Sequence, residues 1–291
     1  MTEQNPRLEW DEMLKLPIEK LNEYSHIPLQ VFNTADDMFR YLARYTVDII
    51  KENNEKGIPT SIIWPCGPKK HFPYIVELTN EECISWKNTL NIQMDEWLTW
   101  DCKLLPKNHP FNLQSYIRNH LFGCIKAELA PDEDRLVFHD PMDMGKVDRC
   151  LDRTGPVDVV FGGFGFTGHF AYNEPFISRW GYVSNEDFIN CRTRIVATTD
   201  ETFIMHSHRS VGGNTRLVPQ FGVTVGMKDL LNAKKIKLVS DGGAWKQTIL
   251  RLICMHEPTV KYPCTFVQTH TDAEVLVDLA TAQSPPFDFT N

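Results

Sequence analysis

Residues 157–175 (VDVVFGGFGFTGHFAYNEP) bring several groups capable of acid–base chemistry into one short stretch. The stretch begins with β-branched and aromatic residues, which is typical of a buried strand in a parallel sheet. His169 and Glu174 follow the glycines at the end of that strand, where sites form in parallel α/β sheets. We therefore expect a glycine turn that presents His169 and Glu174 to a substrate.

The spacing of Gly163, Gly165 and Gly168 also matches the fingerprint of a dinucleotide-binding turn. That fingerprint requires a helix that begins at the last glycine, so that its first amides can hold a pyrophosphate. Pro175 would break such a helix within about two turns. We therefore expect no nucleotide cofactor.

A second pair of carboxylates, Asp95 and Glu96, follows a short apolar strand predicted at 91–94. This is the position that a general base would occupy at the carboxyl edge of a parallel sheet. A solvated turn is the alternative interpretation, and the motif alone does not decide between the two.

Basic residues near other predicted strand ends could bind an anion. Gly67, Lys69 and Lys70 lie in a loop after the strand predicted at 61–64, where backbone amides and ammonium groups could form an anion cradle. Two further basic residues elsewhere in the chain, Arg209 and Lys246, could bind a phosphate. Surface lysines in a turn are equally often only solvated, so this alternative stays open.

The bulk composition narrows the class of partner. The chain has 291 residues, 42% of them hydrophobic, and a formal net charge of -8, which argues against nucleic acid as a main partner. The N-terminal residues lack the pattern of a signal peptide, and no apolar run is long enough for a membrane helix, so we expect a cytoplasmic protein without a membrane partner. The cysteines form no CxxC pair, and His206 and His208 have no third ligand at a suitable spacing, so we expect no metal.

Short apolar runs alternate with helical patterns along most of the chain, which predicts an α/β fold with a parallel sheet and crossover helices. The expected strands are 61–64, 91–94, 136–139, 157–161, 194–198, 223–225, 236–239 and 265–269. The expected helices are 113–122, 245–255 and 272–282, with a further one that is capped by Thr34 and ends at Gly57. We expect an N-terminal extension (1–29), one α/β domain (30–283), a tail (284–291), and an ordered loop near the site at 176–190.

Four motifs resemble those of the glucosamine-6-phosphate deaminase/isomerase family. Residues 162–175 are similar to its G-[IV]-G-x-D-G-H-I-A-F-N-E-P signature, and 93–97 (QMDEW) to its N-M-D-E-Y motif. Residues 191–195 (CRTRI) resemble S-R-T-R-I, and 218–226 (VPQFGVTVG) resemble V-P-x-x-A-L-T-V-G. The similarity covers about residues 31–283 and implies a Rossmann-like fold with helices on both faces of the sheet and no nucleotide cofactor.

The resemblance also implies a reaction and residue roles. Family enzymes open the ring of an amino-sugar phosphate, move a proton between C1 and C2, and release ammonia to leave a ketose phosphate. By position, Asp95 matches the carboxylate that moves the proton, His169 the histidine that assists ring opening, and Glu174 the carboxylate that supports it. Arg209 and Lys246 match phosphate-binding residues.

Two departures from the family pattern affect the chemistry. Thr167 stands where the signature has an aspartate, which removes a favourable charge near His169 and lowers its expected basicity. The family's P-T-G-G-T-P loop is PCGPKK at 65–70, which loses a backbone donor at Pro68 and gains Lys69 and Lys70. The bound anion could therefore differ from an ordinary sugar 6-phosphate.

Our leading hypothesis is an aldose–ketose isomerase/deaminase that acts on a phosphorylated amino sugar, with Asp95, His169 and Glu174 as catalytic residues. The expected substrate-binding residues are Gly67, Lys69, Lys70, Glu96, Thr167, Arg209 and Lys246. One alternative is an isomerase of a different anionic sugar that releases no ammonia, and another is a sugar-phosphate-binding protein with impaired catalysis. The expected partner is a small sugar phosphate, and a homo-oligomer remains possible.

Overall fold

A seven-stranded parallel sheet forms the centre of the molecule, which is seen here in a computed structural model that describes residues 7–175 and 181–286. The strands, in spatial order, are β1 (Leu29–Phe32), β10 (Ala273–Asp278), β9 (Ile236–Ser240), β6 (Val159–Gly163), β2 (Thr60–Trp64), β3 (Thr89–Gln93) and β5 (Leu136–Val137). Every neighbouring pair is parallel, so all carboxyl ends meet at one edge of the sheet. The predicted fold class is confirmed.

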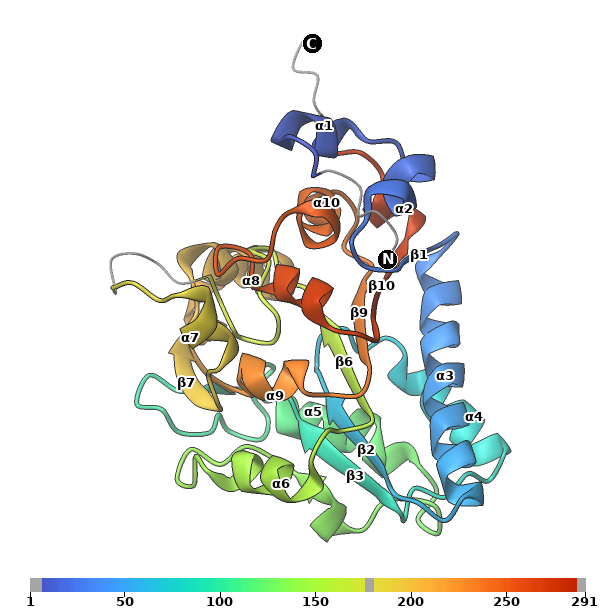
Figure 1. Ribbon diagram of the computed structural model, residues 1–291. Helices are drawn as coiled ribbons and strands as arrows, with labels where there is room; N and C mark the ends of the chain where they lie inside the picture. Colours follow the sequence, from blue (N-terminus) through green and yellow to red (C-terminus); the bar gives the residue numbers. More distant parts are fainter. Residues whose placement is uncertain (1–6, 176–180, 287–291) are drawn as a thin grey trace.

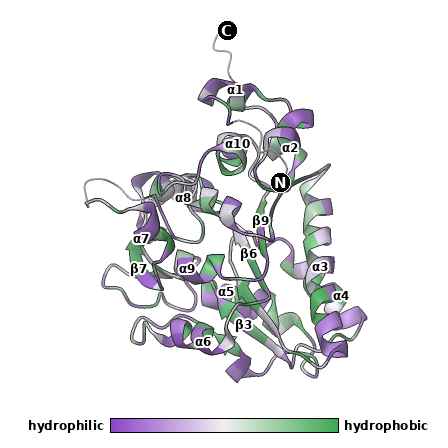
Figure 2. Cartoon of the chain, viewed as in Figure 1, coloured by the Kyte–Doolittle hydropathy of each residue, from purple (hydrophilic) through white to green (hydrophobic). Residues whose placement is uncertain are grey.

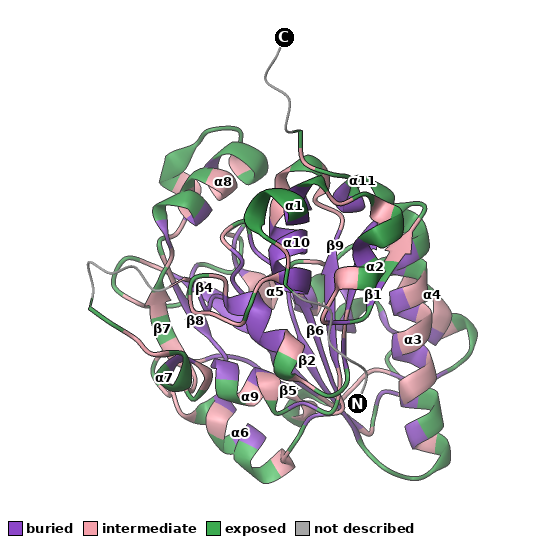
Figure 3. Cartoon of the chain, turned by 45° about the horizontal axis from the view of Figure 1, so that its top comes forward, coloured by how far each residue is buried: buried purple, intermediate pink, exposed green. Residues whose placement is uncertain are grey.

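Helices cover both faces of this sheet (Figure 1). On one face, α3 (Ala35–Glu55), α4 (Phe72–Glu81) and α5 (Leu113–His120) pack on alternate strand residues such as Ile62 and Trp64. On the other, α6 (Lys146–Thr154), α9 (Met227–Leu231) and α10 (Gln247–Met255) pack on residues such as Ile63. The central strands are hydrophobic (Figure 2), and Figure 3 shows them buried while outer helices such as α8 (Asp200–Val211) carry exposed residues. Burial on both sides explains their continuous apolar runs.

The long helix α3 begins and ends as its sequence predicts. The Thr34 hydroxyl accepts a hydrogen bond from the amide of Asp37 at 3.1 Å, which satisfies a first-turn donor. Met38, Leu42 and Ile50 recur at helical spacing and are fully buried against the sheet. Gly57 follows the helix with a φ of 67°, a conformation that favours glycine.

A second, antiparallel sheet contains β4 (Asp95–Leu98), β8 (Phe221–Thr224) and β7 (Arg194–Ala197). The strands predicted at 194–198 and 223–225 therefore exist, but their placement in the parallel sheet was wrong. Met94 joins the two sheets, since its amide donates to Trp64 at 2.9 Å and its carbonyl accepts from Val225 at 2.9 Å. A short apolar run does not reveal which sheet it joins, because pairing depends on distant strands.

Two predictions near the C-terminus were wrong. Residues 265–269 belong to a 3₁₀ segment, η7 (Pro263–Thr269), and not to a strand. The predicted helix at 272–282 is instead strand β10 followed by the short α11 (Leu279–Ala282). Because β10 lies between β1 and β9, its apolar residues are buried on both faces of the sheet. The spacing of apolar residues in such a run does not distinguish a strand from a buried helix.

The N-terminal residues pack on the main domain. They form α1 (Trp10–Lys15), η1 (Ile18–Lys20) and α2 (Leu21–Tyr24), with Met13 and Leu14 buried, and the amide of His26 donates to Cys254 of α10 at 2.7 Å. Part of the predicted loop at 176–190 lies outside the described residues, and the rest contains a short helix, α7 (Asn185–Ile189). Of the predicted tail, 287–291 lies outside them as well. None of the helices described here has the length and apolar character needed to cross a membrane.

Candidate active site

A cavity of about 550 Å³ opens at the carboxyl edge of the parallel sheet. Its walls come from the segments that follow β2, β3, β6 and β9, together with α8. The polar lining includes Cys66, Gly67, Lys69, Asp95, His169, His206, Ser240, Asp241 and Lys246. Segments far apart in the chain meet here because parallel strands end at the same edge.

Asp95 is the first residue of β4 and lines this cavity. Its side chain is buried, and its backbone is paired with Thr224 of β8. Burial and the neighbouring Glu96 charge raise the pKa of Asp95 to about 8. A carboxyl group with a pKa near neutrality can both take up and return a proton, as a proton-transfer base must.

Glu96 points the other way, so its predicted role in substrate binding is not supported. Its carboxylate accepts hydrogen bonds from the amides of Trp97 (2.9 Å), Leu113 (2.8 Å) and Gln114 (2.6 Å) and from the Gln93 side chain (2.9 Å). Leu113 and Gln114 begin α5, so Glu96 caps a helix. Neighbouring residues of a strand face opposite sides, and only Asp95 therefore reaches the cavity.

His169 and Glu174 form a pair that Thr167 joins. The Nδ1 atom of His169 donates to Oε2 of Glu174 at 2.9 Å, and Thr167 donates its hydroxyl to the same oxygen at 2.8 Å. The Thr167 hydroxyl also lies 3.0 Å from Nδ1 of His169. Burial alone would raise the pKa of Glu174, but the His169 charge and hydrogen bonds outweigh it, so the pKa is lowered. Glu174 is therefore held as a carboxylate behind His169, and Thr167 contacts this pair instead of lining the cavity.

The glycine-rich turn allows this imidazole to lie directly on the backbone. A Cβ atom at Gly165 would fall 1.8 Å from Nε2 of His169, so no other residue fits there without displacing the ring. The Gly165 amide donates to the carbonyl of His169 at 2.9 Å, which closes the turn. The chain after Gly168 forms a loop, not the helix that a dinucleotide fingerprint requires.

Three of the predicted anion-binding residues line the cavity: Gly67, Lys69 and Lys246. The Nζ atom of Lys69 lies 3.7 Å from the centre of the Tyr116 ring, and burial lowers the pKa of this lysine. Lys246 is buried and donates to the carbonyl of Phe164, and burial lowers its pKa to about 7. Both cations thus already have partners within the protein.

The two remaining basic residues lie at the edge of the cavity. Lys70 forms an ion pair with Asp241, and its side chain remains 68% exposed. Arg209 is exposed on α8, and its guanidinium lies 4.3 Å from the centre of the Trp245 ring, which does line the cavity. Neither residue is part of the cavity wall, although both are beside it.

An aromatic wall was not predicted from the sequence. Trp97 and Phe111 line the cavity, and His206 lies edge-on to their rings at 5.3 and 5.7 Å. Burial lowers the pKa of His206 to about 4, so this imidazole is neutral. The period of two along β4 puts Trp97 on the same face as Asp95, and this was the available signal. Within the described parts of the chain, no group of three or more His, Cys, Asp or Glu residues is arranged to hold a metal.

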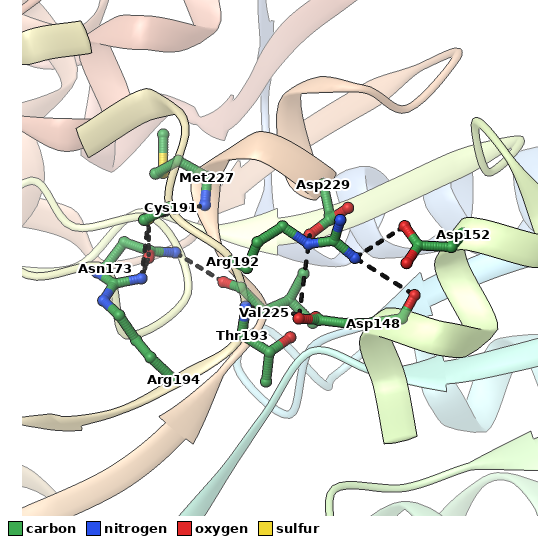
Figure 4. A network of polar contacts seen from close by, with 10 residues as sticks. All are labelled: Asp148, Asp152, Asn173, Cys191, Arg192, Thr193, Arg194, Val225, Met227 and Asp229. Atoms are coloured by element: carbon green, nitrogen blue, oxygen red, sulfur yellow. Dashed lines mark hydrogen bonds and ion pairs between the residues drawn. The ribbon is translucent and has the colours of Figure 1, made fainter. Parts of the chain in front are cut away.

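The loop that carries Glu174 is anchored from the small sheet (Figure 4). Arg194 donates to the side-chain oxygen of Asn173 at 2.7 Å and contacts the sulfur of Cys191 at 2.9 Å. The Asn173 amide group in turn donates to the carbonyl of Val225 at 3.0 Å. Asn173 immediately precedes Glu174, so these contacts help to position the catalytic candidate.

Arg192 extends the same network to two helices (Figure 4). Its guanidinium lies 2.9 Å from Asp152 and 3.5 Å from Asp148, both on α6, and 3.0 Å from Asp229 on α9. Burial raises the pKa of Asp229 to about 6, and the Arg192 charge opposes this rise. One cation therefore holds three carboxylates and ties the loop before β7 to the body of the domain.

No protein-family model matches the chain, but individual relatives do. It is 26% identical to the glucosamine-6-phosphate deaminase of Porphyromonas gingivalis over 250 residues, which is 82% of this chain and 88% of the relative. It is 28% identical to that of Pectobacterium carotovorum over 265 residues, which is 87% of this chain and 89% of the relative.

Solved structures show the same fold. A monomeric glucosamine-6-phosphate deaminase superposes with a TM-score of 0.74 at 21% identity, covering 88% of this chain and 99% of that one. A 6-phosphogluconolactonase from Trypanosoma brucei superposes with a TM-score of 0.61 at 16% identity, covering 88% and 97%. At these identities the likeness concerns the fold, and the chemistry must be argued from the site.

Proposed function

We propose that this chain, which is similar to glucosamine-6-phosphate deaminases over most of its length, is a divergent member of that family and that it isomerises and deaminates a phosphorylated amino sugar. A glucosamine-6-phosphate-like substrate would give a ketose phosphate and ammonia. The observation that carries this proposal is that a carboxyl group with a pKa of about 8, Asp95, shares one cavity with His169. That the protein acts in the cytoplasm, and that it forms a homo-oligomer, stay predictions from the sequence.

The proposed steps follow from these contacts. His169, with Nδ1 held by Glu174, gives a proton from Nε2 to the ring oxygen, and the ring opens. Asp95 removes the proton from C2 of the open aldose while the aldehyde oxygen at C1 takes up a proton from solvent, which gives an enolamine, and Asp95 then returns its proton to C1, which leaves a protonated imine at C2. Water adds to the imine carbon, the C–N bond breaks, and the nitrogen leaves as ammonium, so that a ketose remains. Lys69 and Lys246 stand on the part of the wall where a phosphate would bind.

The Asp95→Asn substitution tests the proposal. We expect turnover to fall at least about 100-fold while substrate affinity is kept, because an amide cannot act as a base. In the unaltered enzyme, turnover should rise with pH until about 8, since only the ionised Asp95 accepts a proton. Steady-state kinetics over a pH series measure both effects.

Asp101→Asn provides the matched control, because Asp101 lies in the exposed turn after β4, where its partners among the described residues are Thr99 and Lys103. This variant should retain full activity. Normal turnover by the Asp95→Asn variant would reject the assignment.

Isomerisation without ammonia release is a second candidate, and Thr167 is the observation that favours it. In the proton relay formed by His169, Glu174 and Thr167, this chain has a hydroxyl where the family motif has a carboxylate. The proton transfers that accompany loss of the amine would then differ. Parallel assays of ammonia and ketose product distinguish the two reactions. Equal amounts of ammonia and ketose formed from an amino sugar phosphate support deamination. Ketose formed only from an aldose phosphate that carries a hydroxyl at C2, which releases no ammonia, supports simple isomerisation.

A further inference from the structure

His206 is a second imidazole in the cavity, and the proposed proton transfers do not use it. It lies on α8 and lines the cavity together with Ser210, which follows one helical turn later on the same face. Its ring is edge-on to those of Trp97 and Phe111, with interplanar angles of 90° and 85°. Edge-to-face contacts with two rings restrict the orientation of a third, so this imidazole is held in one position at the cavity wall.

The surroundings keep His206 neutral. Burial lowers its pKa to about 4, and the charges of His169 and Lys246 act in the same direction, whereas the charge of Glu174 opposes them. A neutral imidazole carries one N–H donor and one acceptor nitrogen. It can therefore form a hydrogen bond with an uncharged polar group of the substrate, but it adds no charge to attract the phosphate.

One ring nitrogen of His206 already has a neighbour on α8. Its Nδ1 atom lies 3.4 Å from the Ser210 hydroxyl, which donates or accepts according to the tautomer of the ring. Nε2 is therefore the nitrogen that could serve a ligand. A sugar hydroxyl can both donate and accept, so it fits Nε2 in either tautomer.

The neighbours of His206 also indicate which part of the substrate it faces. In the proposed steps, His169 protonates the ring oxygen, which is attached to C5, and Lys246 stands where the phosphate on C6 would bind. His206 shares the cavity with both residues and is close enough for their charges to affect its pKa. C1 and C2 must lie beside Asp95, so the nearest hydroxyl-bearing carbon to the C5 end of the sugar is C4.

We propose that His206 is a specificity-determining residue, whose Nε2 atom forms a hydrogen bond with the C4 hydroxyl of the sugar phosphate. Inversion at C4 would move that hydroxyl away from a ring whose orientation is fixed, so this contact selects the configuration at C4. The inference rests on the proposed function, since it uses the placement of that substrate between Asp95, His169 and Lys246.

Binding of sugar alcohols tests the contact without any reaction. Glucitol 6-phosphate lacks a carbonyl at C1 and cannot be isomerised, and its 3-deoxy and 4-deoxy derivatives each lack one hydroxyl. By calorimetry, the unaltered protein should bind the 4-deoxy derivative about tenfold more weakly than glucitol 6-phosphate, because one neutral hydrogen bond is lost at a buried site.

His206→Phe keeps a ring at this position but removes both nitrogens. It should bind glucitol 6-phosphate about tenfold more weakly and should no longer distinguish it from the 4-deoxy derivative. The ratio between glucitol 6-phosphate and the 3-deoxy derivative should stay as in the unaltered protein. His206→Gln retains a donor and an acceptor and should keep part of the preference for the C4 hydroxyl.

His208→Phe is the matched control, since His208 is exposed on the same helix and is not among the residues that line the cavity. It should leave all three affinities unchanged. Equal binding of glucitol 6-phosphate and its 4-deoxy derivative by the unaltered protein would overturn the proposal, as would a preference that His206→Phe retains at C4 or loses at C3 instead. If glucitol 6-phosphate does not bind at all, the phosphorylated substrate class fails as well. Calorimetry is independent of turnover, so a failed Asp95 assay leaves this test readable.

Discussion

A single hydroxyl, that of Thr167, completes the contact between the two residues proposed to open the sugar ring. It donates to Glu174 and lies within hydrogen-bond distance of His169, where the family motif would place a second carboxylate. Within residues 7–175 and 181–286, Glu174 is then the carboxylate that pairs with the imidazole and orients it. A threonine satisfies the geometry without putting two like charges about 3 Å apart.

Replacement of Thr167 by valine measures the value of that hydroxyl. The shape is kept, but Glu174 loses one hydrogen bond, which costs about 1–3 kcal/mol when the acceptor stays buried. We expect kcat to fall roughly tenfold with little change in KM, because the loss affects the relay and not the substrate contacts. Thr167→Ser keeps the hydroxyl and should remain close to the unaltered enzyme. Equal kcat values for the valine and serine variants would show that the hydroxyl has no part in the relay.

At the scale of one element, strand β4 separates two adjacent carboxylates into different roles. Asp95 faces the cavity, whereas Glu96 faces the start of α5 and accepts hydrogen bonds from two of its first amides. The cap holds α5 against β4, and Leu113, at the first turn of that helix, lines the cavity. The same strand thus positions the proposed base and builds the wall beside it.

Glu96→Gln should lower the free energy of unfolding by about 2–4 kcal/mol. The substitution keeps the size of the side chain but removes its charge and turns one acceptor into a donor that faces the α5 amides. Urea denaturation measures the change. Glu133→Gln is the control, since Glu133 is 73% exposed and pairs with Arg118 at the surface, and it should shift stability by less than about 1 kcal/mol. Equal effects of both substitutions would contradict a capping role for Glu96.

At the scale of the whole molecule, the cluster around Arg192 connects parts that are distant in sequence. It joins α6 and α9 to the loop before β7, and through Arg194 and Asn173 it reaches the turn that carries Glu174. These contacts link the packing of α6 and α9 to the position of the turn that carries Glu174, through charges that are only partly buried.

Arg192→Met should destabilise the protein in a pH-dependent way. Because the pKa of Asp229 is raised to about 6, its ionisation lowers stability as pH rises, and Arg192 offsets this loss. Without Arg192 the loss is larger, so the difference from the unaltered protein should grow between about pH 5 and pH 8. Urea denaturation at both pH values tests this. Arg149→Met, which breaks an exposed pair with Asp143, should show a small and constant difference, and a similar result for Arg192→Met would contradict the proposed role.

Much of the fold could be predicted because the signals are local. The cap at Thr34, the apolar spacing of α3, and the short buried strands β2 and β9 all follow from neighbouring residues. The prediction of a helix at β10 is wrong, since a run of apolar residues buried on both faces has no period that distinguishes a strand from a helix. Its assignment depends on β1 and β9, which lie far away in sequence.

Asp95, His169 and Glu174 can be proposed as catalytic residues from the sequence, because they lie in short motifs that follow strands, and strand ends of a parallel sheet meet at one edge. The direction and partners of each side chain follow from the folded structure instead. It turned Glu96 toward α5 and paired Lys70 with Asp241, 171 residues away. Contacts of this kind depend on the packing of distant segments, which no local pattern of residues encodes.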